Sequence, residues 1–273
     1  MTVDEDAIDM NEIVGTHDIL FITLDTLRYD VAQSLFERGE LPVLARHLPP
    51  SGWQRRHTPG SFTYAAHHAF FAGFLPTPAP AGRNPRLFAT AFRGSTTTTR
   101  RTCVFDEENI VAGLAARGYR TICIGGVGFF NKETALARVL PGMFDESHWN
   151  AGLGVTNRHS TQRQVDLAVA RLAAAPGRAF LFVNVSAIHA PNDFFLPPEA
   201  QPRDARASHA AALRYADGAL APLLDACARR HPTFAIVCSD HGTLLGDDGL
   251  EGHRVAHEDV WTVPYAHFFL GRP

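Results

Sequence analysis

Two acidic segments have the residue types and the placement of a metal site. Asp25 directly follows the apolar run 18–24, and Asp240 and His241 follow the apolar run 234–238 after a single serine. Carboxylate oxygens and imidazole nitrogens together suit a hard or borderline divalent cation. An aspartate after a buried strand can also cap the next helix, so each segment alone fits a structural role equally well.

A threonine in the segment 57–73 could act as a nucleophile. Thr63 precedes residues 64–72, which can be helical and end at Gly73, so we expect it at or near a helix N-terminus. The partial positive charge there favours an ionised hydroxyl or a phosphoryl group. An alkoxide needs stronger activation than a helix dipole, and a divalent metal would provide it. Taken alone, this segment favours the alternative, in which Thr63 is a plain helix cap.

The elements that would position these residues alternate between strands and helices. Short apolar, β-branched runs predict buried strands, and segments with apolar residues at helical spacing predict helices. The predicted strands are 18–24, 121–124, 179–185, 234–238 and 265–270, and the predicted helices are 106–117, 161–174 and 207–230. This alternation is typical of an α/β fold with a mostly parallel central sheet flanked by helices on both faces. Functional groups gather at the carboxyl ends of such strands.

Composition and charge exclude several classes of protein. The 273 residues are 45% hydrophobic and 19% charged, with a formal net charge of −3. These values exclude a disordered chain, a collagen and a coiled coil, and they give no reason to expect nucleic acid as a partner. The widely spaced cysteines indicate small reduced core residues rather than disulfides or a zinc knuckle. They are Cys103, Cys123, Cys227 and Cys238.

We expect a short flexible acidic leader over residues 1–15, followed by a single catalytic domain over 16–273. The leader contains five acidic residues and no apolar core, so it fits neither a signal peptide nor an anchor. No stretch approaches the roughly 18 consecutive apolar residues of a membrane span. We therefore expect a cytoplasmic protein without a membrane partner.

Taken in order, the motifs resemble those of the alkaline phosphatase superfamily, specifically its sulfatase-like branch. They are Leu24-Asp25-Thr26-Leu27-Arg28, the segment that closes at Gly73, Gly118-Tyr119-Arg120-Thr121, Ser186-Ala187-Ile188-His189, and Ser239-Asp240-His241-Gly242 with Gly252-His253 behind it. The last of these is the most specific. The resemblance implies an alkaline phosphatase-like fold and a metal bound by Asp25, Asp240 and His241. It also implies that Thr63 is both a metal ligand and the nucleophile.

The resemblance assigns further residues around this centre. His189 and His253 match histidines that, in transferase-like members, hold a second metal or contact the phosphate. A competing role for His189 is that of general acid for the leaving alkoxide. Asp193 could complete a second metal site. Three other histidines lie near the site in sequence and could substitute: His67, His68 and His257. Asp30 is expected to pair with Arg28 or to cap rather than to bind metal.

Departures from the sulfatase pattern set sulfatase chemistry aside. Sulfatases carry a cysteine that is oxidised to formylglycine within Cys-x-Pro-Ser-Arg, whereas this chain has Thr63 there and Ala, Ala and His at 65–67. That aldehyde cannot be made from threonine. Residues 126–128 replace the Lys-x-His pair of sulfatases, and Lys132 is the only lysine in the chain. A threonine nucleophile instead resembles the phosphodiesterases and the phosphoethanolamine or glycerol phosphate transferases of the superfamily.

Two further segments are candidates for substrate contacts. The glycines Gly125, Gly126 and Gly128 lack the third glycine of a dinucleotide motif, so we expect a tight turn near the substrate and no dinucleotide. Residues 76–101 predict a long loop whose arginines could clamp an anion or simply face solvent. These arginines are Arg83, Arg86, Arg93, Arg100 and Arg101.

We therefore predict a metal-dependent phosphoric ester hydrolase that forms a phospho-threonine at Thr63. Its substrate would be a small-molecule or modified-peptide anionic ester, and its cofactor one or two zinc ions, with manganese and calcium as alternatives. The first alternative is a transferase of the phosphoethanolamine or glycerol phosphate type. The second is a catalytically silent, metal-stabilised binding protein. Because the last predicted strand lies near residue 273, we also expect no C-terminal subdomain of the sulfatase kind.

Overall fold

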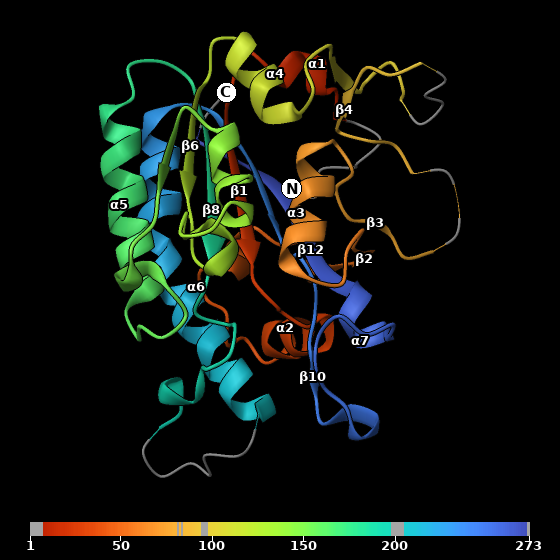
Figure 1. Ribbon diagram of the computed structural model, residues 1–273, viewed down its shortest axis with the longest axis vertical. Helices are drawn as coiled ribbons and strands as arrows, with labels where there is room; N and C mark the ends of the chain where they lie inside the picture. Colours follow the sequence, from red (N-terminus) through yellow and green to blue (C-terminus); the bar gives the residue numbers. More distant parts are fainter. Residues whose placement is uncertain (1–7, 81, 83, 94–97, 198–204, 272–273) are drawn as a thin grey trace.

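A mixed eight-stranded sheet forms the centre of the protein (Figure 1). The computed structural model describes residues 8–80, 82, 84–93, 98–197 and 205–271. The strand order is β3-β2-β12-β9-β1-β8-β6-β7. The strands are β1 Asp18–Leu24, β2 Gln54–His57, β3 Thr77–Pro78, β6 Arg120–Ile124, β7 Glu146–His148, β8 Ala179–Val185, β9 Thr233–Cys238 and β12 Thr262–Leu270. From β9 to β7 all neighbours are parallel, whereas β12, β2 and β3 pair antiparallel at the other edge.

Helices cover both faces of the sheet, as the sequence predicted. They are α1 Met10–Ile13, α2 Tyr29–Glu37, α3 Thr63–Phe71, α4 Ile110–Ala116, α5 Ser160–Ala174, α6 Ala205–Arg230 and α7 Glu258–Trp261. Side chains alternate across a strand, so β1 serves two cores. Leu20 and Ile22 pack with α2, α5 and α6, whereas Ile19 and Phe21 pack with α1, α3 and α4. Both faces of β1 are therefore buried, which explains its continuous apolar run.

The predicted elements differ from the observed ones at the ends of helices and of strands, and β12 begins three residues earlier than predicted. β1 and β8 have the predicted bounds, and α5 and α6 begin one and two residues earlier than predicted. The helix predicted over 106–117 begins only at Ile110, because the Asn109 side chain accepts a hydrogen bond from the Ala112 N–H and caps it there. α2 and β2 were not predicted.

The predicted flexible leader does not extend through residues 8–15. Residues 1–7 lie outside the described part of the chain, but Met10 and Ile13 are buried in α1. The Met10 N–H also donates to the Arg101 carbonyl at 2.9 Å. Apolar contacts therefore hold this segment on the α3 face of the sheet.

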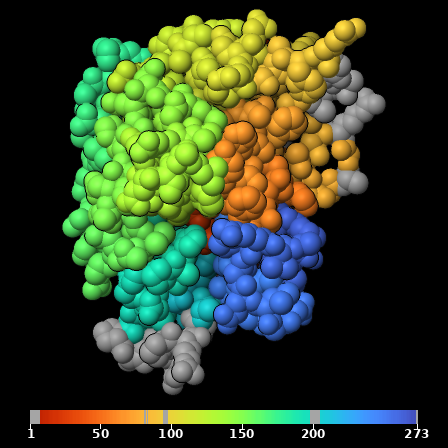
Figure 2. All heavy atoms as spheres, viewed as in Figure 1, coloured from red at the N-terminus to blue at the C-terminus, as the bar shows by residue number. Residues whose placement is uncertain are grey.

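The predicted loop over 76–101 contains structure of its own. Besides β3, it includes β4 (Phe88–Thr90), which pairs in parallel with β5 (Cys103–Phe105). Figure 2 shows that segments distant in sequence share one surface, with green, orange and blue regions packed against one another. Within the described residues, no helix combines the length and the apolarity that crossing a membrane requires.

Gly126, in the turn after β6, packs closely against the neighbouring strand β8. A Cβ atom added to Gly126 would lie 2.2 Å from the Asn184 carbonyl oxygen, whereas one added to Gly128 would meet nothing within 4 Å. We therefore expect Gly126→Ala to lower the free energy of unfolding by about 1–3 kcal/mol through overpacking. Gly128→Ala is the matched control. Urea denaturation followed by circular dichroism measures both, and equal stability of the two variants would contradict this packing.

Candidate metal centre and active site

Three side chains converge at the carboxyl ends of two neighbouring strands. Asp25 follows β1, and Asp240 and His241 follow β9, which pairs with β1. One ligand atom from each residue lies within 4.8 Å of the others, and all three residues are fully buried. The structure thus brings together the three residues that the strand ends and the resemblance suggested.

Backbone groups orient Asp240 and His241. Asp240 Oδ1 accepts hydrogen bonds from the N–H groups of Thr26 at 3.1 Å and His241 at 3.0 Å. Thr26 adopts a left-handed φ of +63°, which is unusual for a β-branched residue. His241 Nδ1 donates to the Gly242 carbonyl at 2.9 Å, so the neutral ring presents the lone pair of Nε2 to the cluster.

The donor set fits a metal ion. Asp25 Oδ1 and Asp240 Oδ2 are buried and have no hydrogen-bond partner among the described residues. Asp240 Oδ2 also lies 3.4 Å from His241 Nε2, so lone pairs face one another. Burial and the neighbouring Asp240 raise the pKa of Asp25 to about 6, and burial raises the pKa of Asp240 to about 7. A divalent cation would supply the charge that these acceptors lack.

The Thr63 hydroxyl faces this cluster. Thr63 is the first residue of α3 and is 3% exposed, and its Oγ1 lies 3.5 Å from Asp25 Oδ2 and 3.4 Å from His241 Nε2. The N-cap of α3 is Phe62, which makes no capping hydrogen bond with its side chain. The interpretation of Thr63 as a plain helix cap is therefore wrong for this structure.

Polar residues of α3, β1 and β8 hold Thr63 and Asp25 in place through hydrogen bonds. His67 Nδ1 donates to the Thr63 carbonyl at 2.7 Å, and its Nε2 lies 2.9 Å from Thr23 Oγ1. Burial lowers the pKa of His67 to about 3, so the ring is neutral at physiological pH. Asn184 on β8 lies 3.2 Å from Thr23 Oγ1 through its Nδ2 and donates to Asp25 Oδ2 at 3.1 Å. His67 is therefore a buried support in this structure, and Asn184 was missed, although it is the one polar residue in an apolar strand.

Two more histidines lie beside the cluster. His189 follows β8, and His253 follows β11 (Glu251–Gly252), which pairs with β10 (Leu244–Leu245). The His253 ring centroid lies 4.6 Å from that of His241 and 5.9 Å from that of His189. His189 Nδ1 donates to the Ala190 carbonyl at 2.6 Å. Their roles as second metal ligands or acid catalysts stay predictions.

Other candidates lie apart from the cluster. Asp193 begins a 3-10 turn and is exposed. His68 is exposed and stacks on Tyr64 with 5.2 Å between ring centroids. His257 caps α7. Asp30 Oδ1 accepts from Arg28 Nε at 2.8 Å, which confirms the predicted pairing.

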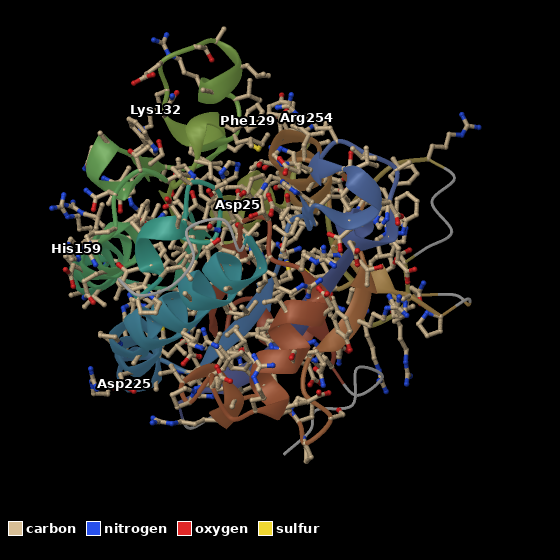
Figure 3. The ribbon with its side chains drawn as sticks, turned by 90° about the horizontal axis from the view of Figure 1, so that it is seen from below. Asp25, Phe129, Lys132, His159, Asp225 and Arg254 are labelled. Atoms are coloured by element: carbon tan, nitrogen blue, oxygen red, sulfur yellow. The ribbon has the colours of Figure 1, made fainter. Side chains whose placement is uncertain are left out.

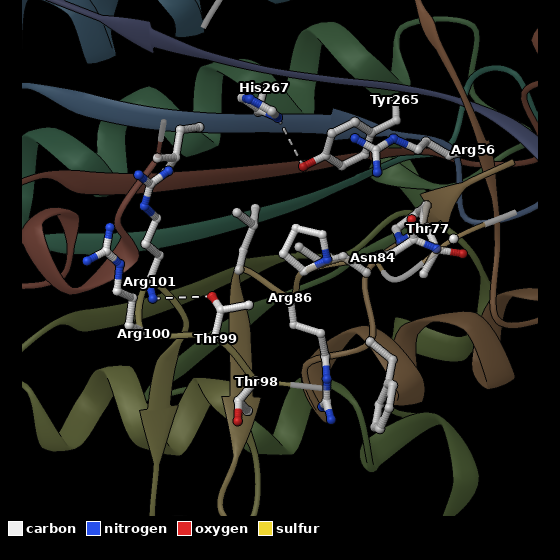
Figure 4. Close-up of a pocket in the computed structure, with 17 residues that line it drawn as sticks. Arg56, Thr77, Asn84, Arg86, Thr98, Thr99, Arg100, Arg101, Tyr265 and His267 are labelled. Atoms are coloured by element: carbon white, nitrogen blue, oxygen red, sulfur yellow. Dashed lines mark hydrogen bonds between the residues drawn. The ribbon is translucent and has the colours of Figure 1, made fainter. Parts of the chain in front are cut away.

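Three of the five loop arginines line a different space, and Arg93 is not among them. Arg83 lies outside the described residues. Arg86, Arg100 and Arg101 line a cavity of about 1210 Å³ beside β2 and β12 (Figure 4). None of the cluster residues lines this cavity, so these arginines are not placed to clamp an anion at Thr63.

The fold is alkaline phosphatase-like, because a protein in the alkaline phosphatase superfamily from Vibrio parahaemolyticus shares it at 18% identity, with a TM-score of 0.52 over 95% of this chain and 61% of that one. This chain belongs to the sulfatase family, whose pattern matches residues 17–267. None of the curated proteins compared with the sequence matches it.

Several solved structures share the fold. The C-terminal periplasmic domain of phosphoethanolamine transferase EptC from Campylobacter jejuni is 12% identical, with a TM-score of 0.61 over 93% of this chain and 80% of that one. The corresponding EptC domain from Escherichia coli, in complex with Zn, is 14% identical, with a TM-score of 0.59 over 93% and 74%. The lipoteichoic acid synthase LtaP from Listeria monocytogenes is 12% identical, with a TM-score of 0.59 over 99% and 69%.

The raised pKa values of Asp25 and Asp240 predict opposite effects of pH on the metal-free and the metal-bound protein. Between about pH 4 and 7 the folded state holds protons that the unfolded chain has released, so the free energy of unfolding of the metal-free protein falls as pH rises. Metal binding needs ionised carboxylates, so the rise in melting temperature on adding zinc should grow over the same range.

Thermal denaturation with and without zinc, from pH 5 to 8, measures both effects. Asp240→Asn should abolish the response to zinc. Asp225→Asn, at an exposed position on α6, should leave it unchanged. A wild-type protein that zinc does not stabilise at any pH would contradict the metal centre.

Proposed function

We propose that this protein transfers a phosphoryl-linked group from a phosphodiester to an alcohol, with Thr63 as the covalent carrier. The observation that carries the proposal is the buried Thr63 hydroxyl, which lies 3.4 Å from His241 Nε2 and 3.5 Å from Asp25 Oδ2. Threonine cannot become formylglycine, which argues against sulfate ester chemistry. The phosphoethanolamine transferases among the structural relatives favour transfer over the hydrolysis that the sequence alone favoured.

Asp25, Asp240 and His241 would hold the metal ion, with Thr63 as a further ligand. A bound divalent ion would lower the pKa of the threonine hydroxyl and polarise a phosphoryl oxygen. Zinc is the first candidate because an imidazole belongs to the donor set, and an EptC domain has been solved with Zn. Manganese and calcium are the alternatives, and His189 and His253 are candidates for a second ion.

The first half of the reaction moves the group onto Thr63. Thr63, whose proton has passed to solvent, attacks as an alkoxide, so that the Oγ1–P bond forms and the bond to the leaving alcohol breaks. His189, when protonated, would donate its Nε2 proton to the leaving oxygen. The N-terminal amides of α3 would stabilise charge on the phosphoryl oxygens.

The second half returns Thr63 to its starting state. The neutral His189 takes a proton from the incoming alcohol, whose oxygen forms a new bond to phosphorus while the Oγ1–P bond breaks. Water in place of the alcohol gives hydrolysis by the same residues.

We also propose the substrate class and the location from the sequence. The substrate would be a small-molecule or modified-peptide ester. The protein would be cytoplasmic, without nucleic-acid or membrane partners.

The nucleophile is tested by variants of Thr63. Thr63→Ala and Thr63→Val should lower kcat for bis-p-nitrophenyl phosphate by at least about 1000-fold, because the covalent route is lost. Thr63→Ser keeps a hydroxyl and should retain activity within about 10-fold. Zinc content is measured for each variant, so that loss of metal is not mistaken for loss of the nucleophile. Full zinc-dependent turnover by Thr63→Ala would refute the assignment.

Transfer and hydrolysis are separated by their products. We expect the zinc-loaded protein, given p-nitrophenyl phosphorylethanolamine and excess glycerol, to release p-nitrophenol and form glycerol phosphorylethanolamine, detected by mass spectrometry. Free phosphorylethanolamine as the main product would favour the hydrolase. If the zinc-bound protein cleaves neither phosphate nor sulfate esters, this result would favour a catalytically silent, metal-stabilised binding protein.

A further inference from the structure

Three aromatic side chains border Thr63 at the edge of the core, and Tyr64 and Phe129 pack against that core. Phe62 precedes Thr63 and Tyr64 follows it, and both contact Phe129, with ring centroids 6.3 and 5.8 Å apart. Phe129 belongs to the 3-10 turn Gly128–Phe130, which follows β6. All three rings are only partly buried. Ligand sites combine aromatic side chains with a few polar groups, and here three rings adjoin the residue whose hydroxyl faces the cluster.

Arg254 adds positive charge to the same surface. Its guanidinium carbon lies 5.5 Å from the centroid of the Phe62 ring, within cation–π distance. Figure 3 labels Phe129 and Arg254 next to one another, and the Phe62 ring contacts both. Arg254 directly follows His253, so the surface adjoins the metal centre on the side of the histidines.

The backbone of Arg254 is fixed rather than free. Its N–H donates to the Ser61 carbonyl at 3.0 Å, and its φ is +71°, in the left-handed region that residues other than glycine seldom adopt. Such conformations concentrate at functional sites, where the surrounding structure holds them. The hydrogen bond ties the loop after β11 to the segment that carries Thr63.

The charge of Arg254 is available to a ligand. The side chain is exposed, and no carboxylate lies within ion-pair distance of it among the described residues. Arg28 shows the contrast, because it is buried and pairs with Asp30 and Asp259. A guanidinium that is held in place and has no acidic partner can bind a carboxylate or phosphate through two parallel hydrogen bonds.

We infer that Phe62, Phe129 and Arg254 form a subsite for the part of the substrate beyond the reacting phosphorus. This part would combine an apolar, planar group, which packs on the rings, with a second negative charge, which binds Arg254. The inference rests on the proposed function only in placing the reacting phosphorus at Thr63.

Binding without turnover tests the subsite. Isothermal titration of the zinc-loaded protein compares phenylphosphonate with 4-carboxyphenylphosphonate, which differ by one carboxylate and cannot be cleaved. We expect the carboxylated compound to bind about 10-fold more tightly, the effect of one charge-assisted contact. Arg254→Gln should abolish this preference and Arg254→Lys should keep part of it. Phe129→Ala should weaken both compounds alike.

Arg117→Gln is the matched control, because Arg117 is also exposed and lies 5.9 Å from a phenylalanine ring, that of Phe105, at the end of α4. The Arg117→Gln variant should prefer the carboxylated compound as strongly as the wild type does. The subsite is overturned if the wild-type protein does not prefer 4-carboxyphenylphosphonate to phenylphosphonate. It is also overturned if Arg254→Gln keeps the wild-type preference. A protein that shows the preference but cleaves no ester keeps the subsite and refutes the proposed function. Thermal denaturation shows whether each variant is folded. If Arg254→Gln does not fold, the preference measured for Arg254→Lys tests the subsite instead.

Discussion

The burial of two carboxylates beside each other, at the ends of β1 and β9, is the constraint on which the rest of this structure depends. Asp25 and Asp240 are removed from water, and a buried charge is costly unless it is paired or coordinated. Local hydrogen bonds reach only one oxygen of each, from Asn184 to Asp25 and from two backbone N–H groups to Asp240. The remaining oxygens have no hydrogen-bond partner among the described residues, and a divalent cation would supply a partner to both.

Sheet register explains how the surrounding polar groups meet. Thr23 on β1 pairs with Asn184 on the parallel strand β8, so their side chains lie on the same face. His67 reaches this pair from α3 and holds the Thr63 carbonyl with its other nitrogen. Thr63 is therefore tied through His67 to β1, the strand that Asp25 follows. A one-residue slip of β8 would send Asn184 to the opposite face and break this connection.

The sequence could predict what depends on local pattern. The apolar runs located β1 and β8 correctly, and the geometry of parallel strands placed Asp25 beside Asp240. What it missed depends on contacts between distant segments. The segment around Thr63 taken alone fitted a helix cap, and only the family resemblance connected Thr63 with the cluster, because its partners lie 38 and 178 positions away. No local sequence pattern distinguished Asn184 or Arg254 as a functional residue. Residues 8–15 are held by contacts with segments distant in sequence, which a short stretch of sequence cannot reveal.

Thr26 carries a consequence for how rigidly Asp240 is held. A β-branched residue at φ +63° is held in a turn that a glycine would adopt without steric cost, and its N–H is fixed toward Asp240. Glycine would also let the turn sample many other conformations. A glycine at residue 26 would therefore remove the steric strain of the turn and at the same time restrict the N–H that faces Asp240 less. A side chain at this position thus exchanges backbone strain for a better-fixed hydrogen-bond donor beside Asp240.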